Sequence, residues 1–180
     1  MHPTHDDNSQ ISSNTIHSDL LAAMKFAYEP SGLTCKNVTK EAESEEYSAC
    51  IFEMNNRQIK FRTGKITPTK IGQFVTLWKR IGDGPILPHD LEDPIDLFVV
   101  SVRSAERLGQ FVFPKTILFE KDIVSKEGKG GKRAMRIYPP WDITDSKQAK
   151  KTQDWQLSYF FEIHSNESIN AGRVQKLFNS

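Results

Sequence analysis

Positively charged side chains gather in two stretches of this sequence, and the chemistry they offer is phosphate binding. The run KFRTGKITPTKIGQFVTLWKR covers residues 60–80, and from Arg57 to Arg80 the chain has seven Lys or Arg and no Asp or Glu. The second stretch, KEGKGGKRAMR, covers residues 126–136 and has five Lys or Arg against one Glu. Segregated charge of this kind lets a chain of net charge +1 present a basic face to a polyanion.

The first stretch contains a predicted phosphate-contact zone. Alternation in a predicted strand puts Lys60 and Arg62 on one face. The dipeptide Thr67-Pro68 predicts the start of a helix, where backbone N–H groups favour anions. The run TGKITPT lacks the glycine spacing and the ending of a Walker loop, which disfavours nucleoside triphosphates. The predicted zone is Lys60, Arg62, Lys65, Thr67 and Lys70, with a merely solvated charged surface as the alternative.

The second stretch is predicted to be a mobile loop, because Gly128, Gly130 and Gly131 interrupt it. Basic loops of this kind order on polyanions, although exposed lysines also serve solubility alone. Trp141 follows two prolines, so it could stack on a base or a small ligand, or close the end of the core. The second predicted zone is Lys129, Lys132, Arg133 and Arg136, with Trp141 as a stacking platform.

Catalytic side chains are harder to group. The five histidines lack metal-ligand spacing and no nucleophile elbow is present, so we expect neither a metal site nor a cofactor. In metal-dependent nucleases, carboxylates hold Mg²⁺ and a lysine supports the attacking water. Asp96, Lys115 and Glu53 could form such a set, but Phe113 stands where an acid should precede the lysine. We therefore expect a binding protein without catalysis. The alternatives are a divergent Mg²⁺-dependent nuclease and an accessory protein that binds a small anion or a partner.

Apolar spacing predicts the elements that must position these residues. The pair Asn55-Asn56 tolerates positive φ and predicts a hairpin between two strands. The run IDLFVVSV, residues 95–102, predicts a central strand buried on both faces, joined by a turn at residues 107–109 to its partner QFVFP. Helices are predicted at residues 18–29, from Thr67-Pro68 through Trp78, at 146–159 and at 168–178, with a further strand at 134–138.

Length and composition indicate one domain. A chain of 180 residues is long enough for a single core, and we expect a disordered leader at residues 1–15 before one α/β domain at 16–180. Its sheet should be mixed, largely antiparallel and flanked by helices. Cys35 and Cys50 are expected to be ordinary thiols of the interior. The sequence has neither an apolar run of membrane-spanning length nor a signal-peptide pattern, so we expect a cytoplasmic protein without a membrane partner.

Four stretches resemble one family: FRTGKITPTKIGQFVTLWKR, GQFVFPK, GKGGKRAMRIYPPWD and QAKKTQDWQLSYF. They are similar to the MepB-like family of small bacterial proteins, whose first-known member is encoded beside a multidrug efflux pump. The similarity runs from Tyr28 to His164, with Gly64 where members usually have Ala. The resemblance implies a restriction-endonuclease-like fold and binding of nucleic acid, double-stranded DNA above all, without an established cleavage activity.

Overall fold

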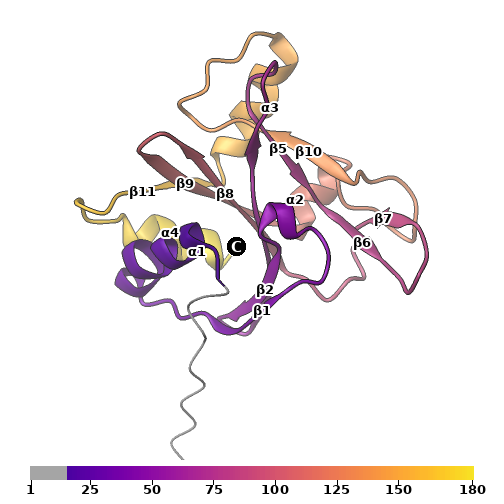
Figure 1. Cartoon of the computed structure of the whole chain (residues 1–180), viewed down its shortest axis with the longest axis horizontal. Coiled ribbons are helices and arrows are strands. Elements are labelled where there is room, and N and C mark those ends of the chain that lie inside the picture. The colour runs from indigo at the N-terminus through magenta and orange to yellow at the C-terminus, as the bar shows by residue number, and fades with distance from the viewer. Residues whose placement is uncertain (1–15) are drawn as a thin grey trace, which may run out of the picture.

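A six-stranded sheet forms the centre of the protein (Figure 1). The computed structural model describes residues 16–180, so the leader predicted for residues 1–15 lies outside the described residues. Neighbouring strands are antiparallel except β3 and β8, which are parallel, and the sheet is therefore mixed and mostly antiparallel, as predicted. Its strands, in spatial order, are β1 (Lys36–Lys40), β2 (Cys50–Met54), β3 (Arg57–Thr63), β8 (Leu97–Ser104), β9 (Arg107–Pro114) and β11 (Phe160–Ile163).

Two smaller sheets and the helices complete one mixed α/β domain. The second sheet has the order β10 (Ala134–Ile137), β5 (Gln73–Thr76) and β4 (Lys65–Ile66), and a third pairs β6 (Trp78–Arg80) with β7 (Ile86–Pro88). The α-helices of the described residues are α1 (Ser18–Ala23), α2 (Lys115–Glu120), α3 (Lys147–Leu157) and α4 (Ala171–Phe178). A π-helical turn, Met24–Tyr28, and a 3-10 turn, Glu29–Ser31, extend α1, and another 3-10 turn spans Glu45–Tyr47.

The central sheet separates two apolar cores. Successive residues of a strand point to opposite faces, and in β8 Leu97 and Val99 belong to one core while Phe98 and Val100 belong to the other. Helices α1 and α4 cover the first face and lie side by side in Figure 1. Helix α2 and the β10-β5-β4 sheet cover the second face. The buried run predicted for the centre of the sheet is confirmed, since residues 97–102 are all buried.

Local sequence signals correctly predicted several elements. Asn55 and Asn56 have φ of 52° and 59° and connect β2 to β3, as a tight hairpin turn requires. The helices predicted at 146–159 and 168–178 correspond to α3 and α4. The first helix is also present, although its N-cap is His17, whose Nδ1 accepts a hydrogen bond from the Asp19 N–H at 3.1 Å.

The helix predicted from Thr67-Pro68 is wrong. The segment instead contains a turn, β5 and the first residue of β6, and β4 ends immediately before it. Gly72 has a φ of +82°, which no helix tolerates, and after it burial alternates, with Gln73, Val75 and Leu77 inward. Aromatic and β-branched residues at this spacing fit a strand as well as a helix, and pairing with β10 decided the outcome.

The hairpin turn predicted at residues 107–109 is also displaced. The turn lies at Ala105 and Glu106, and residues 107–109 already pair with β8. Ala105 has a φ of 48°, a conformation for which alanine gives no sequence signal, whereas Gly109 looks like a turn residue. Gly109 serves a close approach instead, because a Cβ there would lie 2.3 Å from the ring of Phe160.

Candidate functional site

A groove lies between α3 and the sheet formed by β10, β5 and β4. Its volume is about 920 Å³, and its walls come from the turn before β5, the segment after α2, strand β10 and helix α3. Figure 1 shows α3 beside β5 and β10, on the side of the molecule away from α1 and α4. The lining side chains with binding chemistry are Lys70, Lys121, Lys132, Arg136, Lys151 and Trp155.

The five cations of the groove carry charge that no carboxylate neutralises. Within residues 16–180, none of them forms an ion pair. Asp145 is the acidic residue among those lining the groove. Some basic side chains elsewhere in the domain are paired, such as Arg80 with Glu43, Arg103 with Asp19, and Arg107 with Glu162. Others, such as Lys25 and Lys36, are unpaired within the same residues but do not line the groove. The groove is therefore a local concentration of uncompensated positive charge, which attracts anions.

Arg136 is the fixed cation of this cluster. It lies half-buried on β10, and its Nη1 donates hydrogen bonds of 3.2 Å to the carbonyl oxygens of Ile71 and Gly72. Carbonyl acceptors orient the guanidinium without cancelling its charge. The turn that presents them needs glycine at position 72, because a Cβ there would lie 2.7 Å from both the Ile137 carbonyl oxygen and the Tyr138 ring.

Helix α3 is a rigid wall. The Ser146 Oγ caps it by accepting a hydrogen bond from the Ala149 N–H at 3.1 Å. The Gln156 side chain joins α3 to β10, accepting from the Tyr138 N–H at 2.9 Å and donating to the Arg136 carbonyl at 3.0 Å. Lys151 and Trp155 are spaced i, i+4 and therefore share the face that lines the groove.

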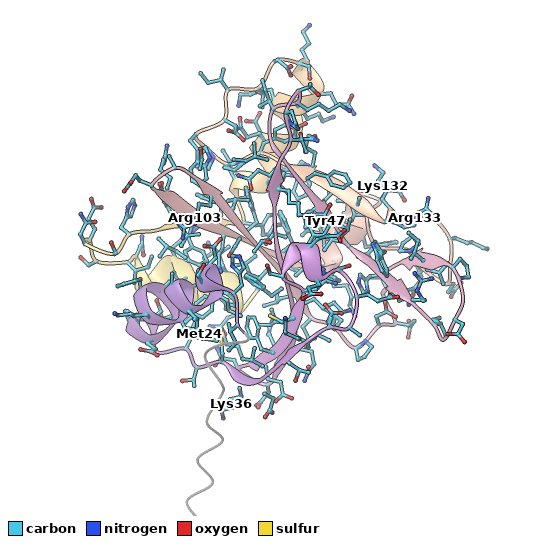
Figure 2. All side chains as sticks on the ribbon, in the orientation of Figure 1. Met24, Lys36, Tyr47, Arg103, Lys132 and Arg133 are labelled. Carbon is cyan, nitrogen blue, oxygen red and sulfur yellow. The ribbon has the colours of Figure 1, made fainter. Side chains whose placement is uncertain are left out.

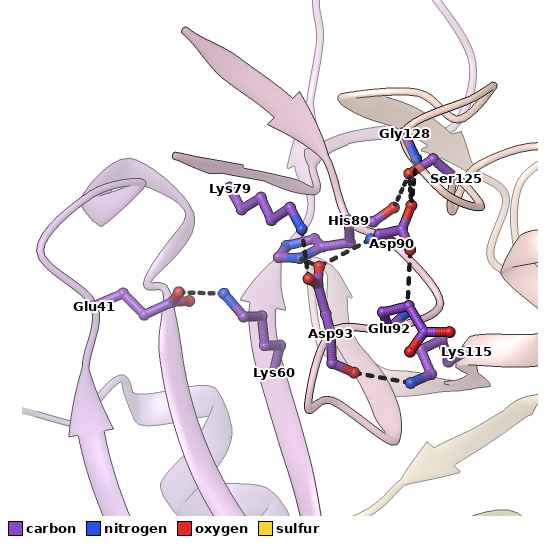
Figure 3. A network of polar contacts seen from close by, with 10 residues as sticks. All are labelled: Glu41, Lys60, Lys79, His89, Asp90, Glu92, Asp93, Lys115, Ser125 and Gly128. Atoms are coloured by element: carbon purple, nitrogen blue, oxygen red, sulfur yellow. Dashed lines mark hydrogen bonds and ion pairs between the residues drawn. The ribbon is translucent and has the colours of Figure 1, made fainter. Parts of the chain in front are cut away.

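Two residues of the first predicted zone belong instead to a partly buried ion-pair network. The carboxylate of Glu41 accepts from the Lys60 Nζ at 2.7 Å (Figure 3), and its other oxygen accepts from the Arg62 Nη1. Arg62 is only 1% exposed. Burial opposes ionisation of Glu41, but the adjacent Arg62 and Lys60 charges outweigh it and lower the pKa of this carboxyl. The predicted shared face is present, but both side chains are held by Glu41, whose single carboxylate compensates one of the two positive charges.

The rest of the first zone is dispersed. Lys65 is exposed on β4, and its Nζ lies 4.5 Å from the ring centroid of Tyr47, a residue labelled in Figure 2. Thr67 is half-buried and its Oγ1 has no hydrogen-bond partner within the described residues. Lys70 is exposed and lines the groove. Because no helix begins at Thr67, the predicted helix-terminus contribution to anion binding does not exist here.

The second predicted zone reaches the groove through Lys132 and Arg136. Arg133 is exposed next to Lys132 (Figure 2), and Lys129 is exposed in the loop. Neither lines the groove. Trp141 does not line it either. Its ring packs edge-on against Phe160 at 5.9 Å, with the Arg107 guanidinium 4.7 Å from the ring centroid.

The basic loop itself is tied down, contrary to the mobility that its glycines predict. The Asp90 carboxylate accepts hydrogen bonds from the Ser125 hydroxyl at 2.6 Å and the Gly128 N–H at 3.0 Å (Figure 3). These bonds, together with one from the Glu92 N–H, lower the pKa of Asp90 to about 2. Asp122 accepts from the Gly131 N–H at 3.1 Å. The loop thus has a defined path toward the groove.

A buried histidine lies between the ion-pair network and this loop. The Nδ1 of His89 is 3.3 Å from Asp93, whose carboxylate also pairs with Lys79 (Figure 3). Its Nε2 has no partner within the described residues. Burial, helped by the nearby Lys60 charge, lowers the pKa of His89 to about 4, so the ring is neutral at pH 7.

The alternative nuclease residues lie close together without forming a metal site. The backbone N–H of Lys115 donates to the Asp96 carbonyl at 3.1 Å, while the Lys115 Nζ donates to the carbonyl of Asp93 at 2.8 Å. The Asp96 carboxylate accepts from the Gln58 N–H at 2.8 Å, and Glu53 is paired with Gln58 in the β2–β3 register. Among residues 16–180, no three His, Cys, Asp or Glu side chains are grouped to hold a metal ion.

Three groove residues were missed by the sequence prediction: Lys121, Lys151 and Trp155. A signal for two of them exists, because residues 148, 151, 152 and 155 follow helical i, i+3, i+4, i+7 spacing and mix amide, cation, hydroxyl and indole on one face. In the sequence, that face looks like ordinary amphipathic packing. Lys121 has no local signal, since only the tertiary fold brings it to the groove.

Comparison with known proteins identifies the family. A model of the MepB-like family matches residues 41–162. A crystal structure of MepB is similar with a TM-score of 0.71 and 33% sequence identity, covering 84% of this chain and 98% of that chain. No curated protein matches the chain significantly. In the part of the chain that the structure describes, no helix has the length and apolar character needed to cross a bilayer. The chain belongs to the MepB-like family.

Proposed function

We propose that this protein binds nucleic acid, duplex DNA above all, through phosphate contacts at the basic groove and without catalysing a reaction on it. The observation that carries the proposal is the set of five groove cations that have no carboxylate partner among residues 16–180. Phosphate oxygens are the natural complement of such a set, and contacts of this type position a protein on a backbone without reading sequence. Lys60 and Arg62 are not part of the proposed contact zone, because both side chains are held by Glu41 and neither lines the groove.

The finer fold assignment is part of the same proposal. A restriction-endonuclease-like architecture, implied by the family resemblance, is supported by a mixed central sheet with helices on both faces. Folds alone do not carry function, so the proposal rests on the groove. We also propose a cytoplasmic location, because that is where a bacterial protein meets cellular duplex DNA.

Salt dependence tests the proposal directly. Labelled duplex DNA is titrated with protein across a salt series and followed by fluorescence anisotropy. Replacing Lys70, Lys132 and Lys151 together by Ala should weaken binding and reduce the slope of log K against log salt by roughly 0.9 for each phosphate that is no longer neutralised. The matched control replaces Lys25, Lys36 and Lys176, which are also exposed and without ion pairs but lie away from the groove. Equal slopes for the two variants would overturn the groove as the binding site.

The same samples distinguish the alternatives. Incubation with Mg²⁺ followed by a denaturing gel should leave the strands intact. Shortening that disappears in Asp96→Asn would instead establish the nuclease. A small-anion site would be established by two results together: saturable binding of inorganic phosphate, and an affinity for oligonucleotides that does not rise with their length.

A further inference from the structure

We infer that the groove takes an unpaired nucleotide or a short single strand, with a base against the indole of Trp155 and its phosphates among Lys121, Lys132 and Lys151. This inference rests on the proposed function and specifies which part of a nucleic acid enters the site. A duplex end with an overhang, a gap or an extruded base would present such a nucleotide.

The size of the groove favours one strand over two. Its volume of about 920 Å³ falls within the range of roughly 300–1,000 Å³ that is typical of sites enclosing a small ligand. A nucleotide has that scale. A double helix, whose major groove alone is about 12 Å wide, would lie across the rim and reach only the exposed lysines.

An aromatic surface is available inside the groove. Trp155 is half-buried, and its ring is held against Phe113 at a centroid distance of 5.5 Å. The Lys121 Nζ lies 5.4 Å from the same ring centroid. Because a lysine side chain is flexible, Lys121 can move off the indole when a base stacks there, and its ammonium can then bind the adjoining phosphate. Stacking of this kind accepts any base, because every base has a π-face.

The arrangement of charges fits a strand better than a single small anion. The groove cations come from five places: the turn before β5, the residue after α2, the loop before β10, strand β10 itself and helix α3. Cations on separate walls can each bind a different phosphate along a strand. A site for a single phosphate instead has its donors gathered around one point. The polar side chains of Gln148 and Thr152, which line the same face as Trp155, are available to the edge of a stacked base.

The test compares three labelled probes: a blunt duplex, the same duplex with a short single-stranded overhang, and the single strand alone. Wild-type protein should bind the duplex with an overhang more tightly than the blunt duplex, because the overhang adds a stacked base to the phosphate contacts of the duplex. Trp155→Leu should weaken binding of the overhang duplex and of the single strand by about 10-fold or more, as expected when base stacking is removed, and leave binding of the blunt duplex nearly unchanged. Trp141→Leu is the matched control, since Trp141 does not line the groove.

Tryptophan fluorescence provides a second readout that does not depend on the leucine variant folding. Binding of the single strand should quench the wild-type emission. In Trp155→Phe, whose ring preserves packing against Phe113, most of that quenching should disappear while Trp78 and Trp141 still report. Equal affinity for all three probes, with identical quenching in both proteins, would overturn the inference and leave the proposed function intact. Failure of the wild type to bind any probe would overturn both.

Discussion

The Nζ of Lys60 donates a 2.7 Å hydrogen bond to the carboxylate of Glu41, the residue that follows β1. The second oxygen of the same carboxylate is bound by Arg62, whose side chain is 2% exposed. One acidic residue thus satisfies two cations of the central strand β3. These two interactions connect the segment after the edge strand β1 to β3, and they hold both basic side chains in place.

Replacing Glu41 by Gln should destabilise the protein by about 3 kcal/mol, because removing one partner of a buried ion pair leaves the other charge uncompensated. Urea-induced unfolding measures the change. Glu43→Gln is the control, since Glu43 and Arg80 form a more exposed pair, for which the expected loss is below about 1 kcal/mol. Similar losses for the two variants would contradict the assignment of Arg62 as a charge that depends on Glu41.

Because the pKa of His89 is lowered, the free energy of unfolding should decrease as the solution is acidified. Its pKa is about 4 in the folded protein, and a histidine in an unfolded chain has a pKa near 6.5. Between these values the unfolded chain binds the additional proton, so stability is complete above pH 6.5 and declines by up to about 3 kcal/mol as the pH falls toward 4. The free energy of unfolding, measured from pH 7.5 to pH 4.5, should show this decline, and His89→Gln should flatten it. If the free energy of unfolding of His89→Gln declined with pH as steeply as that of the wild type, other groups would be responsible for the acid sensitivity.

Gly72→Ala should destabilise the protein by more than about 2 kcal/mol, because the turn needs a positive φ and because the new methyl would meet the Ile137 carbonyl at 2.7 Å. The turn also supplies the carbonyl that holds Arg136, so binding at the groove should weaken as well. Gly82→Ala separates the cost of the positive φ from the cost of the clash. Gly82 also has a positive φ, +57°, but no atom lies within 4 Å of an added Cβ. It should cost about 1 kcal/mol and leave binding unchanged. Thermal unfolding and anisotropy together measure both effects.

Asp90→Ala should free the basic loop without unfolding the domain, because the carboxylate accepts from Ser125 and Gly128. Hydrogen exchange of the Gly128 amide should accelerate strongly, and nucleic-acid binding should weaken as Lys132 loses its fixed position. Asp83→Ala, at an exposed site outside this network, should leave both quantities unchanged. Equal exchange of Gly128 in the wild type and Asp90→Ala would show that the glycine turns alone define the loop.

The two cysteines should react slowly with alkylating reagents in the native protein. Both are free, and burial raises the pKa of Cys35 and of Cys50 to about 12, so almost no thiolate is present at pH 8. Mass spectrometry after a short iodoacetamide pulse should find little modification in the native state and full modification in denaturant. Rapid native labelling of Cys50 would contradict its burial.

Signals confined to a few neighbouring residues predicted the fold well. The Asn55-Asn56 turn, the buried run of β8 and the position of α3 each depend on local backbone preference, continuous burial or helical spacing. The prediction for Thr67 to Arg80 is wrong because the apolar residues there fit both a helical and a strand period. Only pairing with β10, about 60 residues later, distinguishes the two.

The site was less predictable, for a different physical reason. Basic residues are easy to find, but whether a charge is free depends on a distant carboxylate. Glu41 lies 19 positions from Lys60 and 21 from Arg62, and no local pattern connects them. The sequence favoured Trp141 over Trp155 as a stacking platform, yet Trp141 packs against Phe160 and Arg107, and Trp155 lines the groove.

The order of the elements along the chain has a consequence for protein synthesis. Strands β3 and β8 are adjacent and parallel, and the connection between them carries Lys70 and the turn before β5, one wall of the groove. The opposite walls, β10 and α3, come from residues 134–157. When synthesis has reached the end of β9, most of the core strands exist. Of the groove, the wall that carries Lys70 has been made, but the opposite walls are still missing. The nascent chain should therefore gain nucleic-acid binding in one step, after residue 157 has left the ribosome and α3 has packed on β10.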